Sequence, residues 1–531
     1  MPRLLLLLAM LVNLTAPAAQ PNIVVILVDD MGWADIGCYG SEIPTPNLDK
    51  LAANGLRFTQ FYNTGRCCPT RAALLTGLYS HQTGVGHMME NRNAPGYQGH
   101  LNERCATIAE ALKPAGYFTA MTGKWHVGQE QGVTPSNRGF DRSLNAAAGG
   151  FYQPGANRAK LFLNGEAIAN DDARLPKQWY TTDLWTTYGL KFIDEARAAK
   201  KPFFLYLAHN APHFPLQAPA EEIAKFRGKY LAGWGQLRNQ RYARQLELGL
   251  LDPSWKISPR PDTIKAWTSY TDEEKDRFDH LMSVYAAAVA HMDKAVGDLV
   301  AGLKDRGELD NTLILFLSDN GGNAEGGPRG ITLGDEIGSA NSQVFLGMSW
   351  AMLNNTPFRR YKHFTHEGGI SSPLIAHWPK GIPAERHGKL EPQPAHLIDV
   401  MATAVDLSGA TYPATFAGHR ILPMEGISLR PAFAGTPLHR VKPIFWEHEG
   451  NRAVRSGPWK AVMKLKGEWE LYNIDEDRTE QHDLIGVNKA VAGLLIRQWN
   501  DWAATSFVDP WTGPARNNWG EEPRPGKKAK K

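Results

Sequence analysis

The stretch from Asn22 to Asp30 reads NIVVILVDD and sets the pattern that predicts the fold. Its first seven residues are rich in β-branched apolar side chains, which is typical of a strand buried on both faces of a parallel sheet. Two acidic residues follow at once. The same pattern of an apolar run that ends in polar residues recurs at residues 118–122 before Lys124 and His126, at 202–208 before His209 and His213, and at 312–317 before Asp319 and Asn320.

Helical patterns lie between these runs. A helix is predicted to begin at Pro46, and the capping box of Thr107 and Glu110 begins another. Apolar residues at helical spacing predict a long amphipathic helix over residues 281–303. Strands that alternate with helices predict an α/β fold with a mostly parallel sheet. Because such sheets bind ligands beyond the carboxyl ends of their strands, the polar residues there are candidate site residues.

The chain has 531 residues, too many for one ordinary compact core, so we expect a large domain and a smaller one. After residue 430 the pattern changes to short alternating runs separated by glycine and charge, followed by a helical pattern over residues 490–503. This pattern predicts a small antiparallel sheet with a late helix. We expect a main domain over residues 20–430, a smaller α+β domain over 431–510 and a mobile basic tail over 511–531.

The formal net charge is +4, and most of the excess lies at the two ends of the chain. A nearly neutral body argues against nucleic-acid binding, which requires a basic face. At the other end, Arg3, the apolar run 4–12 and small residues at 16–19 predict an export signal over residues 1–19. That run is too short to span a bilayer. We therefore expect an exported protein, periplasmic or secreted, that does not span a membrane.

Four cysteines are present, all in the first fifth of the chain: Cys38, Cys67, Cys68 and Cys105. They are too few and too clustered for a disulfide scaffold, and adjacent cysteines do not bridge without strain. Whether Cys38 pairs with Cys105 stays open.

Hard oxygen ligands follow two of the predicted strands, namely Asp29, Asp30, Asp319 and Asn320. This chemistry suits Ca²⁺ or Mg²⁺ rather than zinc, which prefers nitrogen and sulfur. Each short motif alone is also typical of turns and helix caps. Because both motifs stand at strand ends, a metal site is the favoured interpretation.

Residues 65–77 read GRCCPTRAALLTG, and Pro69 fits the first turn of a helix. Cys67 would lie just before this helix and Arg71 inside its first turn. The helix start and the arginine would attract an oxyanion. The residues alone leave open whether Cys67 is a nucleophile or a buried structural cysteine.

The pentapeptide CCPTR at 67–71, followed by LTG at 75–77, resembles the signature of the type I sulfatases. Further segments resemble that family's motifs in the same order: residues 22–32, 123–128 (GKWHVG), 211–216 (APHFPL), 317–322 (LSDNGG), 362–369 (KHFTHEGG) and 471–484. The resemblance covers nearly the whole chain after the export signal and is greatest to bacterial arylsulfatases.

The resemblance implies a large mixed sheet sandwiched by helices, the alkaline phosphatase-like fold. It implies that a maturation enzyme oxidises Cys67 to formylglycine (3-oxoalanine), whose hydrated aldehyde is the nucleophile, and that Cys68 stays an ordinary cysteine. The implied metal is Ca²⁺ rather than Mg²⁺. Its implied ligands are Asp29, Asp30, Asp319, Asn320 and residue 67.

The resemblance also implies roles for the charged residues. Lys124, Lys362 and Arg71 would compensate the charge of the sulfate and the nucleophile, and Asp319 would accept the proton of the attacking hydroxyl. The groups implied to contact the sulfate are Lys124, His213 and Lys362.

Two histidines complete the implied mechanism. His213, together with the second lysine, would protonate the leaving oxygen. His126 would take a proton from the sulfated gem-diol, so that sulfate leaves and the aldehyde returns. His209, His366 and Glu367 receive no catalytic role, and a turn or supporting role is expected for them.

The expected function is hydrolysis of a small-molecule or carbohydrate sulfate ester, of the arylsulfatase type. One alternative keeps this machinery but acts on phosphonate monoesters or phosphodiesters. Another is a non-catalytic protein that binds sulfated glycans, which requires that Cys67 is never converted. The sequence leaves open the natural substrate, the oligomeric state and the role of the basic tail.

Overall fold

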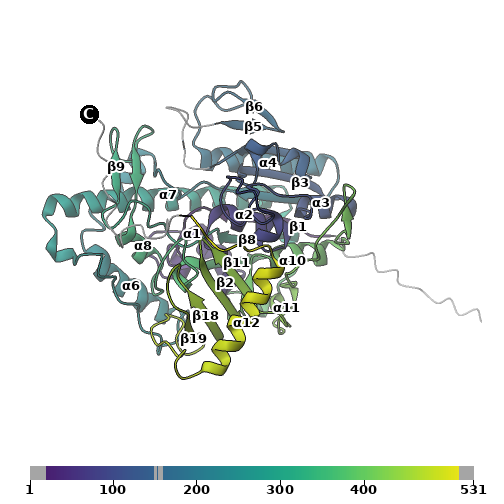
Figure 1. Cartoon of the computed structure of the whole chain (residues 1–531). Helices are drawn as coiled ribbons and strands as arrows, with labels where there is room; N and C mark the ends of the chain where they lie inside the picture. Colours follow the sequence, from purple (N-terminus) through teal and green to yellow (C-terminus); the bar gives the residue numbers. More distant parts are fainter. Residues whose placement is uncertain (1–19, 149–151, 153–159, 514–531) are drawn as a thin grey trace, which may run out of the picture.

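A mixed sheet of eleven strands forms the centre of the molecule (Figure 1). The structure is a computed structural model that describes residues 20–148, 152 and 160–513. The predicted export signal and nearly all of the predicted tail lie outside these residues. The strand order is β12-β2-β11-β8-β1-β7-β3-β4-β5-β6, with β13 also paired to β2. Their bounds are β1 Asn22–Val28, β2 Leu56–Tyr62, β3 Phe118–Lys124, β4 Arg142–Ala146, β5 Leu161–Leu163, β6 Glu166–Ile168, β7 Phe203–Ala208, β8 Thr312–Ser318, β11 Ser371–His377, β12 Lys389–Glu391 and β13 Ala395–His396.

The central strands β8, β1, β7, β3 and β4 are all parallel to their neighbours in this group. Antiparallel pairing occurs toward both edges, where β11 lies between β8 and β2, and where β5 and β6 follow β4. The predicted α/β fold, with its mixed and mostly parallel sheet, is therefore confirmed.

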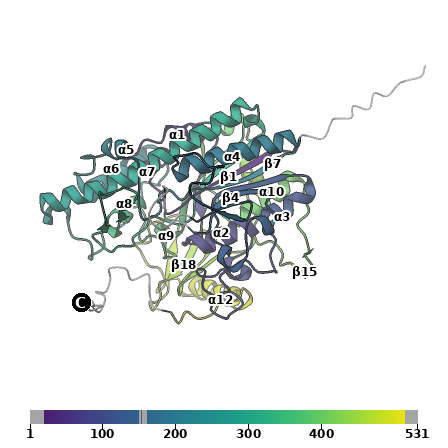
Figure 2. The ribbon, with the colours of Figure 1, turned by 90° about the horizontal axis from the view of Figure 1, so that it is seen from above.

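Helices cover both faces of this sheet (Figure 2). On one face lie α1 (Pro46–Ala53), α4 (Thr181–Ala198) and α7 (Asp272–Asp305), and on the other lie α2 (Cys67–Thr76), α3 (Ile108–Leu112) and α10 (Asp399–Ser408). Side chains of β1 alternate between the two cores, with Val24 packed on the first side and Ile23 on the second. Burial on both faces explains the continuous apolar run of this strand.

Local capping fixes the start of α3. Thr107 Oγ1 accepts a hydrogen bond from Glu110 N, and the Glu110 carboxylate accepts one from Thr107 N, as the capping box predicts. The long amphipathic helix is present as α7.

The remaining helices and paired strands of this region are α5 Ala220–Ala224, α6 Gly233–Glu247, α8 Met348–Asn354, α9 Glu367–Ile370, α11 Arg430–Phe433, β9 Ile331–Leu333 with β10 Gln343–Phe345, and β14 Thr415–Phe416 with β15 His419–Arg420.

A separate antiparallel sheet lies near the C-terminus, as expected (Figure 1). It consists of β16 Ile444–His448, β17 Asn451–Ser456, β18 Trp459–Met463 and β19 Glu470–Asn473, and α12 (Lys489–Thr505) packs on it. One face joins a small core with Tyr62 of β2 and Ile370 of α9. Trp446 Nε1 donates to Asn63 O at 2.7 Å, which ties this sheet to the end of β2.

None of the four cysteines, all of which lie in the described part of the chain, forms a disulfide. Cys38 is in the core on the α7 side of the sheet, whereas Cys105 is in the core on the α2 side. The open question of their pairing is therefore answered in the negative. Among the residues that the structure describes, we find no helix with the length and apolar character needed to cross a bilayer.

Candidate active site

The predicted site residues meet at one edge of the large sheet. Val28 and Ser318 end adjacent strands in register, so Asp29 and Asp319 follow them side by side. Lys124 is the last residue of β3, two strands away in the same parallel group. The topology thus brings together side chains that lie hundreds of residues apart in the chain.

Three carboxylates and one amide form a buried pocket of oxygen atoms. Asp30 N donates to Asp319 Oδ1 at 3.1 Å, and Asn320 Nδ2 donates to Asp30 Oδ1 at 2.8 Å. Asp30 has a φ of 66°, an uncommon left-handed backbone conformation that these contacts hold in place. Asp29 Oδ1 and Asn320 Oδ1 are buried with no hydrogen-bond partner among the described residues. Two orphaned oxygens among these carboxylates fit a hard divalent cation, and a ring nitrogen of His213 lies within 4.8 Å of Asp29 and Asp30.

Two cations on the far side of this pocket neutralise its carboxylates. Lys124 Nζ lies 2.6 Å from Asp29 Oδ2, and Arg71 Nη2 lies 2.8 Å from Asp319 Oδ2 and 3.2 Å from Asp29 Oδ2. Burial opposes ionisation of Asp29, but Lys124 holds its pKa well below the usual range. Burial and the neighbouring Asp29 raise the pKa of Asp319.

Lys362 supplies a third cation from the connection between α8 and α9. Its Nζ lies 2.7 Å from Asp30 Oδ1 and 3.5 Å from Glu325 Oε1. Burial disfavours its charge, but these two carboxylates raise the pKa of Lys362. The three pocket carboxylates are therefore matched by three cations. A bound divalent ion would leave a net positive site, which suits a sulfate ester anion.

Cys67 is the first residue of α2, so the helix begins one residue earlier than predicted. Thr70 Oγ1 donates to Asp319 O at 2.7 Å and fixes the helix start against the oxygen pocket. The sulfur of Cys67 lies close to the sulfur of Cys68 and a ring nitrogen of His126, with all three atoms within 4.8 Å of one another. A hydrogen bond from the Cys68 thiol lowers the pKa of Cys67 despite burial, and nearby positive charge acts in the same direction.

The two predicted catalytic histidines are buried and neutral. Burial, followed by the charge of Lys124, lowers the pKa of His126 to about 4, and its φ of 55° is left-handed. His213 Nδ1 donates to the carbonyl oxygen of Phe214, which leaves Nε2 facing Asp30 at 3.6 Å. Burial also lowers the pKa of His213. Both rings are therefore unprotonated at neutral pH, and each has one ring nitrogen with a free lone pair.

The comparisons with known proteins agree with this geometry. A family model described as "Sulfatase" matches residues 21–410. The chain belongs to the sulfatase family. It is 36% identical to an arylsulfatase of Klebsiella aerogenes over 78% of this chain and 92% of that protein, and 31% identical to an N-acetylgalactosamine-6-sulfatase of Canis lupus familiaris over 91% and 80%. A crystal structure of Ps i-CgsB in complex with k-i-k-neocarrahexaose is similar at 30% identity, with a TM-score of 0.69 over 94% of this chain and 96% of that one.

The sulfatase site contains residues that the sequence analysis did not identify. Asn323 Nδ2 donates to Asp30 Oδ2 at 2.6 Å, and Glu325 Oε1 lies 3.0 Å from Arg66 Nη1. Asn323 stands three residues after Asn320 in the same polar run, so a signal for it was present. Glu325 was not predictable in this way, because its partners come from distant segments.

The residues without a predicted catalytic role have different surroundings in this sulfatase. Glu367 binds Lys460 Nζ at 2.8 Å and Arg478 Nε at 2.9 Å, which links α9 to the C-terminal sheet. His366 Nε2 lies 3.5 Å from a carboxylate oxygen of Glu470. Both ring nitrogens of His209 are buried without a hydrogen-bond partner among the described residues. Supporting roles fit Glu367 and His366.

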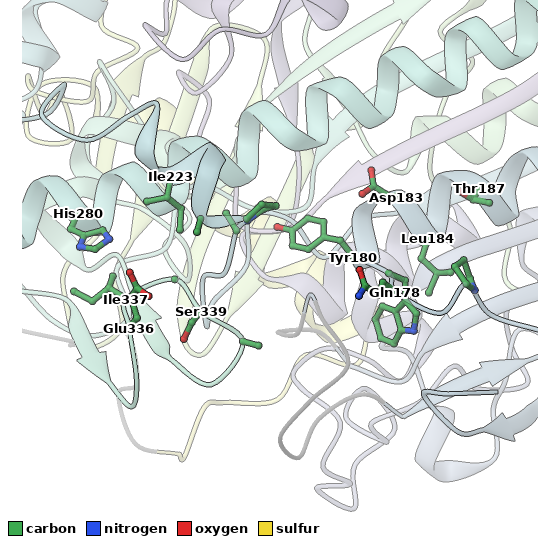
Figure 3. A pocket seen from close by; sticks show the side chains of 17 residues that line it. Gln178, Tyr180, Asp183, Leu184, Thr187, Ile223, His280, Glu336, Ile337 and Ser339 are labelled. Atoms are coloured by element: carbon green, nitrogen blue, oxygen red, sulfur yellow. The ribbon is translucent and has the colours of Figure 1, made fainter. Parts of the chain in front are cut away.

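A cavity of about 850 Å³ lies between α4, α5 and α7 of the sulfatase, and Figure 3 shows Tyr180 and Asp183 on one side of it and His280 and Glu336 on the other. None of the predicted catalytic residues lines this cavity. It borders the site only indirectly, because Tyr180 stacks on Tyr152, whose hydroxyl donates to the His213 carbonyl at 2.6 Å.

Proposed function

We propose that this sulfatase hydrolyses sulfate esters of the arylsulfatase type, with formylglycine at position 67 and Ca²⁺ in the oxygen pocket. One observation carries the proposal. Three buried carboxylates, three buried cations and two neutral histidines converge from separate strands and loops on the start of α2. Membership of the sulfatase family supports the reaction, hydrolysis of sulfuric esters.

The proposed groups suit the residues that surround them. Conversion of Cys67 to formylglycine supplies an aldehyde, whose hydrate offers two hydroxyl groups in place of one sulfur. Asp29, Asp30, Asp319 and Asn320 would hold the metal ion together with position 67. When bound, this ion supplies a Lewis acid that lowers the pKa of a neighbouring hydroxyl and binds sulfate oxygen.

The chain's own residues then bind charge and move protons. Lys124 and Lys362 bind the sulfate oxygens, and Arg71 keeps the oxygen pocket neutral. Asp319, with its raised pKa, accepts the proton of the attacking hydroxyl. His126 is neutral and beside position 67, so it accepts the second proton there. His213 Nε2 faces the leaving oxygen and, with the bound anion raising its pKa, donates to it.

An aromatic surface beside His213 supports an aryl leaving group. Phe214 stacks on His213 with ring centroids 4.3 Å apart, and Phe345 stacks on Phe214 at 4.4 Å. Both phenylalanines are half-buried. Phe345→Ala should raise KM for 4-nitrophenyl sulfate without a comparable change in kcat, whereas the exposed Leu333→Ala on the paired strand β9 should leave KM unchanged. An unchanged KM in Phe345→Ala would argue against an aryl site here.

A comparison of substrates tests the reaction itself. We expect release of inorganic sulfate from 4-nitrophenyl sulfate and much slower turnover of a phenyl phosphonate ester. Faster turnover of the phosphonate would favour the phosphonate monoester hydrolase alternative. Equilibrium binding of sulfated oligosaccharides without any sulfate release would favour the non-catalytic alternative. A screen of aryl and carbohydrate sulfates then identifies the substrate class.

We also propose that the protein is exported after removal of residues 1–19. The proposal is based on the charged, apolar and small-residue segments of the N-terminal sequence. N-terminal sequencing of protein from the cell envelope or the medium should begin near Gln20. Recovery of the full chain in the cytoplasm would contradict it.

A further inference from the structure

Two histidines and a glutamate form a second cluster of metal-ligating side chains, outside the oxygen pocket. His87 follows the short 3₁₀ helix Ser80–Thr83, His448 ends β16, and Glu449 lies in the turn between β16 and β17. One ligand atom from each residue lies within 4.8 Å of the other two. The side chains come from segments more than 350 residues apart, so tertiary folding alone brings them together.

All three residues are buried, and their polar atoms are incompletely satisfied. Their exposed fractions are 2% for His87, 0% for His448 and 1% for Glu449. Both ring nitrogens of His448 lack a hydrogen-bond partner among the described residues, and so does Glu449 Oε2, which has only the His363 ring nitrogen nearby at 3.5 Å. A buried imidazole normally binds at least one partner, so this ring directed at a carboxylate needs an explanation. A ligand held between these atoms provides one.

The surrounding charges favour a cation. His87 Nε2 lies 2.8 Å from Glu449 Oε1, and on the other side of the ring Nδ1 lies 3.3 Å from Glu90 Oε1. This contact lacks hydrogen-bond geometry, so His87 Nδ1 is also without a hydrogen-bond partner among the described residues, but a carboxylate this close to the far nitrogen suits a metal-binding histidine. Nearby, Glu325 is already paired with Arg66, and His363 Nδ1 lies 3.5 Å from Glu449 Oε2. Glu449 thus faces three imidazoles, those of His87, His363 and His448.

The backbone holds Glu449 in an unusual conformation. Glu449 and Gly450 have φ values of 49° and 81° and form the two-residue turn of the β16–β17 hairpin. Asparagine or glycine usually occupies the first of these positions, because other side chains are strained there. A glutamate at this position directs a carboxylate at the two imidazoles.

We propose that His87, His448 and Glu449 bind a Zn²⁺-class transition-metal ion, at a site distinct from the oxygen pocket of the catalytic centre. Two imidazoles and one carboxylate are a ligand set that zinc accepts, with a fourth position open to water. The ion would cross-link residues 84–90 to the hairpin of the C-terminal sheet. Trp511 packs against the His87 ligand, with ring centroids 4.6 Å apart.

Metal titration of the full exported chain tests this site. The protein is stripped with a chelator, saturated with Ca²⁺, and titrated with Zn²⁺ by calorimetry and with Co²⁺ by visible absorption. We expect one equivalent of each ion, and a Co²⁺ ligand-field spectrum without a thiolate charge-transfer band. His87→Gln and His448→Gln should each weaken Zn²⁺ binding by more than about 100-fold, and Glu90→Gln by about 10-fold.

Three controls separate this site from others. His396→Gln removes another buried histidine, and it should leave Zn²⁺ binding intact. Cys67→Ala disrupts the cluster of Cys67, Cys68 and His126, and Asp30→Asn alters the oxygen pocket. The Co²⁺ spectrum should be unchanged in both variants. Circular dichroism checks that each variant is folded, and the half-exposed Glu90 provides a variant that spares the core. Absence of binding, or binding lost in Cys67→Ala but retained in His448→Gln, would overturn the proposal.

Discussion

Positions 67 and 68 carry the same side chain but have different surroundings. A hydrogen bond from Cys68, and then the charge of Lys124 and the nearby His126, lower the pKa of the Cys67 thiol against the effect of burial, whereas burial raises the pKa of the Cys68 thiol. Neighbouring groups, and not the residue type, therefore distinguish the proposed nucleophile position from a packing cysteine.

Substitution of each cysteine tests this distinction. Cys67→Ala should abolish sulfate release while the protein stays folded, because no oxygen nucleophile can be made there. Cys68→Ala should retain most of the activity. Peptide mass spectrometry across residues 66–71 of active protein should show that sulfur is lost at position 67 alone. Full activity with an unmodified Cys67 thiol would contradict the proposed mechanism.

Asn323 is predicted to be a positioning residue for the metal. Its amide holds Asp30 Oδ2 at 2.6 Å and fixes the carboxylate that also binds Lys362. Asn323→Ala should weaken Ca²⁺ binding by about 10-fold, since partners of metal ligands contribute on this scale. The exposed Asn341→Ala serves as the control. Calorimetric Ca²⁺ titration provides the measurement, and excess Ca²⁺ should restore activity of Asn323→Ala.

The sequence predicted site residues where they follow a recognisable strand. Asp29, Lys124 and Asp319 are examples, because a buried strand is a local pattern and its end is visible. Lys362 lies in a connection between helices, and only the family resemblance pointed to it. Arg66 and Glu325 had no signal, because their pairing depends on where two distant loops meet.

The helices and strands that the sequence predicted are those whose formation depends on neighbouring residues. The capping box at Thr107 and the amphipathic pattern of α7 depend on neighbouring residues, and both predictions are confirmed. The insertion of antiparallel β11 between β8 and β2 depends on long-range pairing, and the residue pattern alone did not predict it. Only the family resemblance implied a mixed sheet.

His291 on α7 joins two other helices and gives a pH-dependent contribution to stability. Its ring nitrogens lie 2.9 Å from Asp183 Oδ2 on α4 and 2.9 Å from Glu222 Oε1 on α5. Burial alone would lower the pKa of His291, but these carboxylates raise it to about 9. A raised folded-state pKa stabilises the protein fully below the unfolded value near 6.5, and this contribution is lost as the pH rises through about 9.

Denaturant unfolding at several pH values measures this contribution. Between about pH 6 and about pH 10 the wild type should lose about 2–3 kcal/mol that His291→Gln does not lose. The difference between the two proteins, rather than either curve, isolates the histidine from other titrating groups. Parallel curves would mean that this ion-pair cluster contributes nothing.

At the scale of the whole molecule, one buried ion cluster connects the C-terminal sheet to the large eleven-stranded sheet. Lys460 Nζ of β18 lies 2.8 Å from both Glu367 Oε1 and Glu480 Oε1, and all three side chains are buried. Lys460 and Arg478 lower the pKa of Glu367 to about 2 against the effect of burial, whereas burial raises that of Glu480 to about 7. The two sheets are thus joined by charge as well as by apolar packing.

Removing the shared cation should destabilise this junction. Lys460→Met leaves Glu480 buried without its ammonium partner, at a cost of about 3–5 kcal/mol in the free energy of unfolding. Addition of Glu480→Gln should recover part of this loss, because an amide needs no counter-ion and its oxygen still accepts from Glu367 N. Thermal and denaturant unfolding of the single and double variants test this. A double variant no more stable than Lys460→Met would argue against the charge explanation.

All ten residues of α2 are buried, and Cys67 itself is only 2% exposed. A modifying enzyme has to bind several consecutive residues around its target, and the folded protein exposes none of these ten. The proposed oxidation of Cys67 would therefore require a nascent or still unfolded polypeptide. Under that proposal, a copy that folds before it is oxidised would keep its thiol and stay inactive.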